Sequence, residues 1–142
     1  MTRTFPVGGR FTEEQKEIYD TVLRAQKAAI AVIRPGTPFG EIDRAARKVI
    51  TAAGYGPFLL HGAAHFIGLD VHEGGDAAVP LQAGMVLAVE PGIYVPEKKI
   101  GIRIEDDVLV TPGGARVLSD CAPQERDAVE MQRTEGLMPG GR

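Results

Sequence analysis

The chain has 142 residues, which favours a single domain over residues 1–142 that buries roughly two thirds of its unfolded surface. Its net charge of −3 and the lack of a basic run exclude a nucleic-acid-binding surface, and no hydrophobic run is long enough to cross a membrane. The N-terminus lacks the hydrophobic core of a secretory signal and Cys121 is the only cysteine, so we expect a cytoplasmic protein without an internal disulfide.

Two amphipathic helices are predicted in the first part of the chain. The first begins after Thr12, because Thr12 and Gln15 have the spacing of a capping box, and it ends before Pro35. The second is expected to have Thr37 as its N-cap, a proline at its first position, and Gly54 as its stop. Hydrophobic residues recur at helical spacing in both segments: Ile18, Val22, Leu23, Ala25, Ala29, Ile30 and Ile33 in the first, and Phe39, Ile42, Ala46, Val49, Ile50 and Ala53 in the second.

Strands are predicted from about residue 58 onward, because the hydrophobic period changes there from 3.6 to 2. Residues 58–61 form a short apolar run, and residues 85–90 and 100–105 alternate between hydrophobic and other positions. A further strand-like stretch precedes the helices at residues 2–7. The central part of the chain is therefore expected to form a sheet.

The end of the chain contains a hairpin signal. Residues 107–111 and 115–119 flank a Pro-Gly-Gly turn, which is typical of two antiparallel strands. A short helix is expected at residues 123–131, followed by a flexible tail at about 132–142. This order of elements predicts the α+β class, with two helices packed on a mostly antiparallel sheet.

Three residues on separate segments offer donors for a divalent metal ion: His65, Glu90 and Glu105. Both glutamates end hydrophobic strands, where burying an unpaired carboxylate is costly, so each should have a cation nearby. A metal ion is one such cation, and Arg103, on the same strand face as Glu105, is another. In the alternative interpretation Glu90 and Arg103 form a structural ion pair, and the histidines are polar core residues. The residue types alone leave both interpretations open.

Three motifs resemble the Xaa-Pro peptidases, aminopeptidase P and prolidase, which belong to the family with the pita-bread fold. The motifs are HGAAHFIGLDVHE at residues 61–73, AVEPGIYV at 88–95 and IGIRIEDDVLVT at 100–111. The helical segment TRTFPVGGRFTEEQKEIYDTVL, at residues 2–23, is similar to the family as well. The resemblance implies the C-terminal half of a pita-bread fold, with two helices on a curved, mostly antiparallel sheet.

The resemblance also implies roles for six residues. Three match metal ligands of the family: His65, Glu90 and Glu105. Three match catalytic residues: His72, which contacts substrate and handles protons, His61, which lines the substrate pocket, and Arg103, beside the last glutamate.

Two aspartates complete the ligand set of the family, and their positions fall before Met1. We therefore expect one divalent ion, Mn²⁺, Co²⁺ or Zn²⁺, and no dinuclear site within one chain. Neither Asp106 nor Asp107 is expected to replace the aspartates, because both should face solvent or the neighbouring strand. The functional expectation is a truncated Xaa-Pro metallopeptidase-like protein with impaired or no dinuclear catalysis, acting on proline-containing peptides. The alternatives are a non-catalytic remnant that binds one metal or a protein partner, and one piece of a split enzyme.

A homodimer is also expected. Half of a curved sheet leaves an edge and an apolar face exposed, and several hundred Å² of wet apolar surface costs on the order of 10 kcal/mol at about 25 cal/mol per Å². Because the two halves of the family fold are related by a pseudo-two-fold axis, a second copy of the chain fits the place of the missing half.

Overall fold

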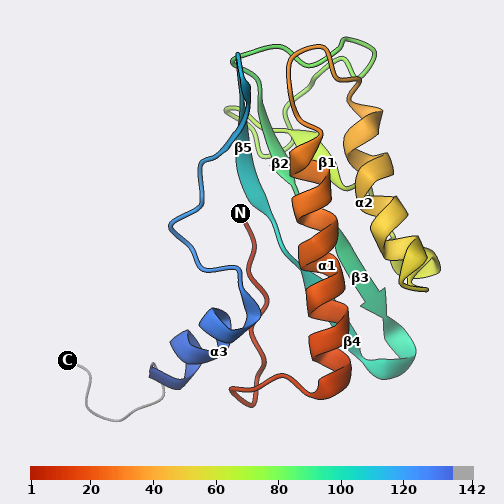
Figure 1. Cartoon of the computed structure of the whole chain (residues 1–142), viewed down its shortest axis with the longest axis vertical. Helices are drawn as coiled ribbons and strands as arrows, with labels where there is room; N and C mark the ends of the chain where they lie inside the picture. The colour runs from red at the N-terminus through yellow and green to blue at the C-terminus, as the bar shows by residue number, and fades with distance from the viewer. Residues whose placement is uncertain (136–142) are drawn as a thin grey trace.

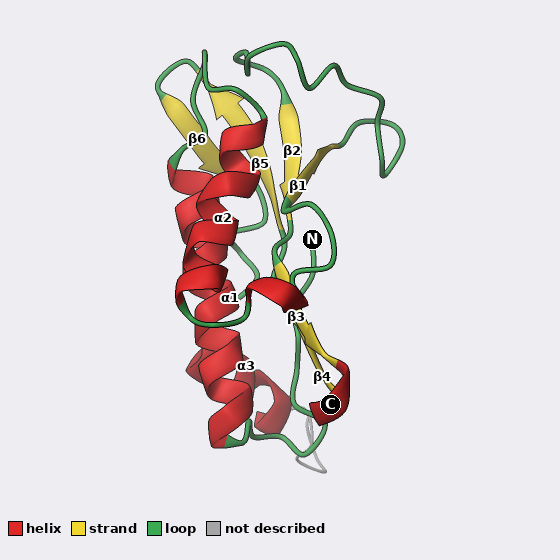
Figure 2. Ribbon diagram, turned by 90° about the vertical axis from the view of Figure 1, so that its right-hand side faces the viewer, coloured by secondary structure: helices red, strands yellow, loops and turns green. Residues whose placement is uncertain are grey.

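The computed structural model describes residues 1–135. Within them, helices lie on one side and strands on the other, so the molecule has two layers (Figures 1 and 2). The helices are α1 (Glu13–Ala31), α2 (Gly40–Ala52) and α3 (Arg126–Glu135). The strands are β1 (Ala64–Phe66), β2 (Val86–Val89), β3 (Gly92–Val95), β4 (Ile100–Arg103), β5 (Asp106–Thr111) and β6 (Gly114–Val117). The predicted α+β class is confirmed.

Helix α1 begins with the predicted capping box. Gln15 N donates to Thr12 Oγ1 at 3.3 Å, and Thr12 N donates to Gln15 Oε1 at 3.0 Å. The hydrophobic stripe of α1 packs against α2 and the sheet, as its helical spacing predicts. The side chains of this core that are fully buried include Ile18, Val22, Ile42, Ile50, Leu87 and Val89.

The strands form two sheets, one in the order β1-β2-β5-β6 and the other β3-β4, and all pairings are antiparallel. The chain passes between the two sheets twice, once from β2 to β3 and once from β4 to β5. Glu90 and Pro91 separate β2 from β3, and Ile104 and Glu105 separate β4 from β5. Pro91 has no N–H to donate to a ladder, which explains the interruption. The strand predicted at 100–105 therefore ends at Arg103, and both glutamates lie at the break between the sheets.

The N-terminal segment forms less strand than expected. Only Thr2 pairs, in an isolated bridge in which Thr2 N donates to Glu105 O at 3.1 Å and Glu105 N donates to Thr2 O at 3.0 Å. The next residue, Arg3, is buried in an ion pair with Asp106, 2.6 Å apart. Asp106 is fully buried beside α1, which corrects the expectation that it faces solvent or the neighbouring strand. Its position is explained by Arg3, Gln26 and Ser119, which all donate to its carboxylate.

Two other elements differ from the sequence-based expectations. Residues 58–61 are not a strand, since a 3₁₀ turn occupies Gly56–Phe58 and the first strand begins at Ala64. Helix α3 continues to Glu135, into the segment where a tail is expected, and residues 136–142 lie outside the described residues. The hairpin of β5 and β6 is confirmed. No helix in residues 1–135 has the length and hydrophobicity needed to cross a membrane.

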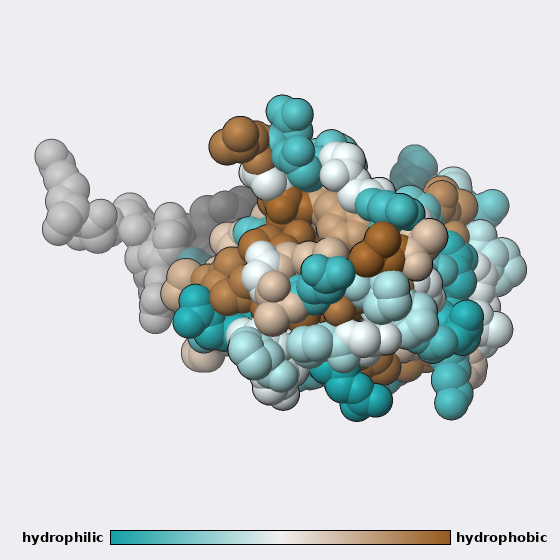
Figure 3. All heavy atoms as spheres, turned by 90° about the horizontal axis from the view of Figure 1, so that it is seen from above, coloured by the Kyte–Doolittle hydropathy of each residue, from teal (hydrophilic) through white to brown (hydrophobic). Residues whose placement is uncertain are grey.

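Some large hydrophobic side chains remain exposed. Leu60, Leu69 and Val71 are among them, and all three belong to the segment between α2 and β2. Figure 3 views the molecule from above, the end where the loop between β1 and β2 lies, and hydrophobic residues are seen there among hydrophilic ones. The loops at this end are therefore not uniformly polar.

Candidate metal centre

Three adjacent strands of the first sheet bring the predicted metal-binding donors together. His65 on β1 is opposite Ala88 on β2, which is opposite Asp107 on β5. Glu90 lies two residues after Ala88 and Glu105 two residues before Asp107, so the alternation of the strands places all three donors on one face. His65, Glu90 and Glu105 each offer a ligand atom, and these atoms lie within 4.8 Å of one another. The side chains of both glutamates are 13% exposed.

The hydrogen bonds of His65 determine which of its ring nitrogens is free. His65 Nδ1 lies 2.9 Å from Phe66 O, and a carbonyl oxygen only accepts, so Nδ1 carries the proton of the neutral ring. His65 Nε2 then has a free lone pair, and it lies 3.6 Å from Glu90 Oε1. A backbone bond that fixes the tautomer in this way is typical of histidines that ligate metals.

Glu90 also pairs with Arg103, as the alternative interpretation predicts. Arg103 Nη1 donates to Glu90 Oε2 at 3.0 Å, and Arg103 Nε donates to Tyr94 Oη at 2.7 Å. Burial lowers the pKa of Arg103, but the bond to Tyr94 and the charges of Glu90 and Glu105 outweigh it, so the pKa is raised overall. The structure thus combines the ion pair with the cluster of three donors, and the two interpretations are compatible.

His61 is connected to this network through Tyr94. His61 Nε2 lies 2.9 Å from Tyr94 Oη, and His61 Nδ1 lies 2.8 Å from Gly62 O. Because Nδ1 faces a carbonyl, Nε2 accepts the hydroxyl proton of Tyr94. Helix α2 holds this loop, since Arg47 donates to His61 O and Asp43 accepts from the following backbone.

His72 lies at the solvent side of the cluster. It is exposed, and its ring centroid is 4.4 Å from that of His65. All six residues predicted from the sequence therefore lie in one continuous set of contacts. Within residues 1–135, the contact that joins His72 to the other five is its ring contact with His65.

Two residues of the site were missed by sequence reasoning. Tyr94 lies within the AVEPGIYV motif, where its place one residue before the end of β3 gave no separate signal. Thr2 donates from its hydroxyl to Glu105 Oε2, although 103 residues separate the two in sequence. A lone threonine has many roles, so only the fold reveals this contact.

The backbone of the first residue also lies beside the cluster. Met1 N is 3.8 Å from Glu105 Oε2 and 3.6 Å from Asp107 Oδ1. Asp107 is thus half-buried beside the cluster, but it does not belong to the group of three converging donors.

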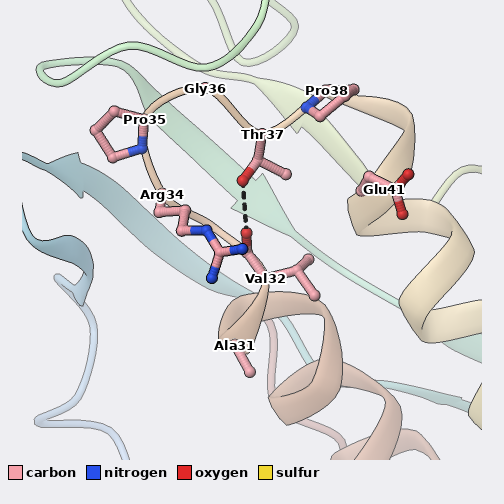
Figure 4. Close-up of a pocket in the computed structure, with 8 residues that line it drawn as sticks. All are labelled: Ala31, Val32, Arg34, Pro35, Gly36, Thr37, Pro38 and Glu41. Atoms are coloured by element: carbon pink, nitrogen blue, oxygen red, sulfur yellow. Dashed lines mark hydrogen bonds between the residues drawn. The ribbon is translucent and has the colours of Figure 1, made fainter.

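A separate hollow lies where α1 is connected to α2, and it contains none of the predicted site residues (Figure 4). Here the structure corrects the predicted start of the second helix. Thr37 Oγ1 donates to Val32 O at 2.9 Å, so it is not a helix cap, and Phe39 takes the N-cap position without a side-chain bond. The predicted stop at Gly54 is confirmed by its φ of +86°.

The donor set suits a divalent cation. The three donors are one imidazole and two carboxylates, which converge from three segments and are mostly buried. A bound cation would offset the cost of burying the two negative charges. Three protein ligands also leave positions for water or substrate, as in catalytic metal sites.

Comparison with known proteins agrees with this geometry. The family model described as metallopeptidase family M24 matches residues 1–112. The chain is 39% identical over 160 residues to the Xaa-Pro aminopeptidase of Haemophilus influenzae, a match that covers 92% of this chain and 37% of the relative. It is 45% identical over 124 residues to the Xaa-Pro dipeptidase of Pyrococcus furiosus, a match that covers 84% of this chain and 35% of the relative. The chain therefore spans about a third of the length of these curated relatives.

A solved structure shows the same fold. The zinc-substituted aminopeptidase P of Escherichia coli in complex with product superposes with a TM-score of 0.88 at 34% identity, covering 96% of this chain and 38% of that chain. The expected fold is confirmed: the chain forms part of the pita-bread fold of aminopeptidase P.

Proposed function

The chain belongs to metallopeptidase family M24, and on that premise we propose that His65, Glu90 and Glu105 hold one divalent metal ion. The observation that carries the proposal is the convergence of these three donors within 4.8 Å on one face of the sheet. Two carboxylates with one imidazole suit Mn²⁺, Co²⁺ or Zn²⁺.

The chemistry that we assign to this site is hydrolysis of the peptide bond before proline. Two of the relatives are named for action on Xaa-Pro substrates, and this chain has their fold and the matching motifs. A bound ion would supply Lewis acidity, which polarises a carbonyl and lowers the pKa of bound water.

The remaining residues orient the ligands and handle the substrate. Arg103, held by Tyr94, fixes the carboxylate of Glu90. His72 is exposed beside His65, where it can exchange a proton with a bound peptide. Both ring nitrogens of His61 already have partners, so we assign it to the pocket wall and not to proton transfer.

The proposal is tested by replacing Glu90. In Glu90→Ala, Mn²⁺ binding is expected to be lost, and hydrolysis of an Xaa-Pro peptide to fall by orders of magnitude. Glu97→Ala is the matched control, because Glu97 is exposed on a 3₁₀ turn outside the cluster. Activity that survives in Glu90→Ala would belong to a contaminating peptidase, and Mn²⁺ binding that survives would rule out Glu90 as a ligand.

A second proposal concerns a partner. We propose a homodimer in which a second copy of the chain covers the exposed face of the sheet, and the exposed hydrophobic side chains of Leu60, Leu69 and Val71 support an apolar contact surface. Light scattering at micromolar concentration is expected to give the mass of a dimer. A monomer would favour the alternative in which this surface meets peptide or another protein. We also propose a cytoplasmic location, because the sequence has one cysteine, Cys121, and so does not use an internal disulfide.

A further inference from the structure

Thr2 contacts Glu105 through both its backbone and its side chain. The backbones exchange two hydrogen bonds, at 3.1 and 3.0 Å. The Thr2 hydroxyl in addition donates to Glu105 Oε2. Thr2 is thereby joined to Glu105 at three points, although 103 positions separate the two residues in sequence.

The backbone around this contact is itself held firmly. Arg3 Nη1 donates to both Glu105 O at 2.7 Å and Thr2 O at 3.0 Å. The same guanidinium pairs with the buried Asp106, so the Arg3 side chain is only 5% exposed. Thr2 therefore has little freedom to move relative to Glu105.

The bond from Thr2 restricts the carboxylate of Glu105. A glutamate has three rotatable side-chain bonds, and Glu105 lies outside the regular strands, at the break between the two sheets. A hydroxyl that donates to one carboxylate oxygen limits rotation of the group and leaves the other oxygen without that bond. Threonine suits this task because its second Cβ substituent restricts χ1 and hence the direction of the hydroxyl.

We propose that Thr2 is a positioning residue that orients Glu105 for metal binding. The inference rests on the proposed metal centre, and it adds a residue that does not itself touch the ion. Outer partners of this kind typically change metal affinity by about 10- to 100-fold when they are removed.

The test compares three variants of the full chain by calorimetric titration with Mn²⁺. Thr2→Val keeps the shape and loses the hydroxyl, and Thr2→Ser keeps the hydroxyl. Thr4→Val is the matched control, because the Thr4 hydroxyl bonds only the backbone of Arg103, at 2.9 and 3.1 Å, among its contacts in the described residues. Urea unfolding of each variant checks that all of them are folded at the titration temperature.

We expect Thr2→Val to bind Mn²⁺ about 10- to 100-fold more weakly at unchanged stoichiometry. Thr2→Ser should recover most of the affinity, and Thr4→Val should bind as the unaltered chain does. Equal Mn²⁺ affinity of Thr2→Val and the unaltered chain would overturn the inference and leave the metal centre intact. Equal losses of Mn²⁺ affinity in Thr2→Val and Thr4→Val would have the same meaning. Failure of the unaltered chain to bind Mn²⁺ would overturn the metal centre and this inference together.

Discussion

Arg103 donates a hydrogen bond to Glu90 Oε2 at 3.0 Å, while the other oxygen of Glu90 faces His65 Nε2 at 3.6 Å. The two oxygens of one carboxylate thus have different neighbours, the guanidinium of Arg103 on one side and the imidazole of His65 on the other. This arrangement orients Oε1 toward the cluster of donors. A structural ion pair and a metal ligand are therefore compatible roles for Glu90.

Removing the hydroxyl of Tyr94 should weaken the metal centre indirectly. Tyr94 Oη accepts from Arg103 Nε at 2.7 Å and bonds His61 Nε2 at 2.9 Å. In Tyr94→Phe, Arg103 loses the bond that holds it against Glu90, so we expect severalfold weaker Mn²⁺ binding and a loss of about 1 kcal/mol in the free energy of unfolding. Calorimetry and urea unfolding measure the two effects, and unchanged affinity would show that Arg103 needs no support from Tyr94.

The buried pair of Arg3 and Asp106 should dominate stability near the N-terminus. Their side chains are 5% and 0% exposed and lie 2.6 Å apart. Arg3→Met leaves the Asp106 carboxylate buried without its cation, which is expected to cost about 3–5 kcal/mol in the free energy of unfolding.

The double variant Arg3→Met, Asp106→Leu removes both charges and is the control for this prediction. Urea unfolding should find it more stable than Arg3→Met alone, because no buried charge is left unpaired. A loss in Arg3→Met below 1 kcal/mol, the range of an exposed ion pair, would contradict the account.

Stability should fall at high pH because of Tyr19. Burial raises the pKa of the Tyr19 hydroxyl from 10.0 to about 12, and this hydroxyl donates to Gln124 O at 2.9 Å. Below pH 10 the group is protonated in both states. Between pH 10 and 12 the unfolded chain releases the proton while the folded chain keeps it, so stability declines by on the order of 2–3 kcal/mol.

Tyr19→Phe isolates that effect. The variant loses a hydrogen bond at every pH, but the part of the decline between pH 10 and 12 that belongs to Tyr19 should be absent. Urea unfolding of both proteins at several alkaline pH values measures the difference. Parallel declines in the two proteins would mean that Tyr19 does not titrate as its burial predicts.

The loop that carries His72 should tolerate a methyl group at one glycine and not at its neighbour. A Cβ at Gly75 would lie 2.2 Å from Phe66 Cδ2, whereas a Cβ at Gly74 would meet nothing within 4 Å. Phe66 follows His65 and stacks on Phe39 with ring centroids 4.8 Å apart, so it cannot move freely. Gly75→Ala should therefore destabilise the protein by about 1–3 kcal/mol. Gly74→Ala should stay close to the unaltered chain in the same thermal unfolding experiment, and equal melting temperatures of the two variants would contradict the packing of this loop.

The elements whose signals are local could be predicted from the sequence. The capping box of Thr12, the stop at Gly54 and the hairpin after β5 depend on neighbouring residues, and all three were confirmed. The predicted start of α2 was wrong because the Thr37 hydroxyl donates to the carbonyl of Val32, five residues earlier. Sequence patterns do not reveal when a side chain bonds another backbone group in place of capping a helix.

Part of the site could also be predicted, because some of its residues lie in local sequence motifs. His65, Glu90 and Glu105 belong to recognisable motifs, and the register of three neighbouring strands brings them together as expected. The contact of Thr2 with Glu105 and the burial of Asp106 against α1 depend on long-range packing. No local pattern encodes these contacts, so they became visible only in the folded chain.

The most direct test of the account is a calorimetric titration of chelator-stripped protein with Mn²⁺, read as ions bound per chain. We predict one ion per chain, with binding abolished in Glu90→Ala and in Glu105→Ala. A complete lack of binding by the unaltered chain, or binding that persists in both variants, would contradict a metal centre made of His65, Glu90 and Glu105.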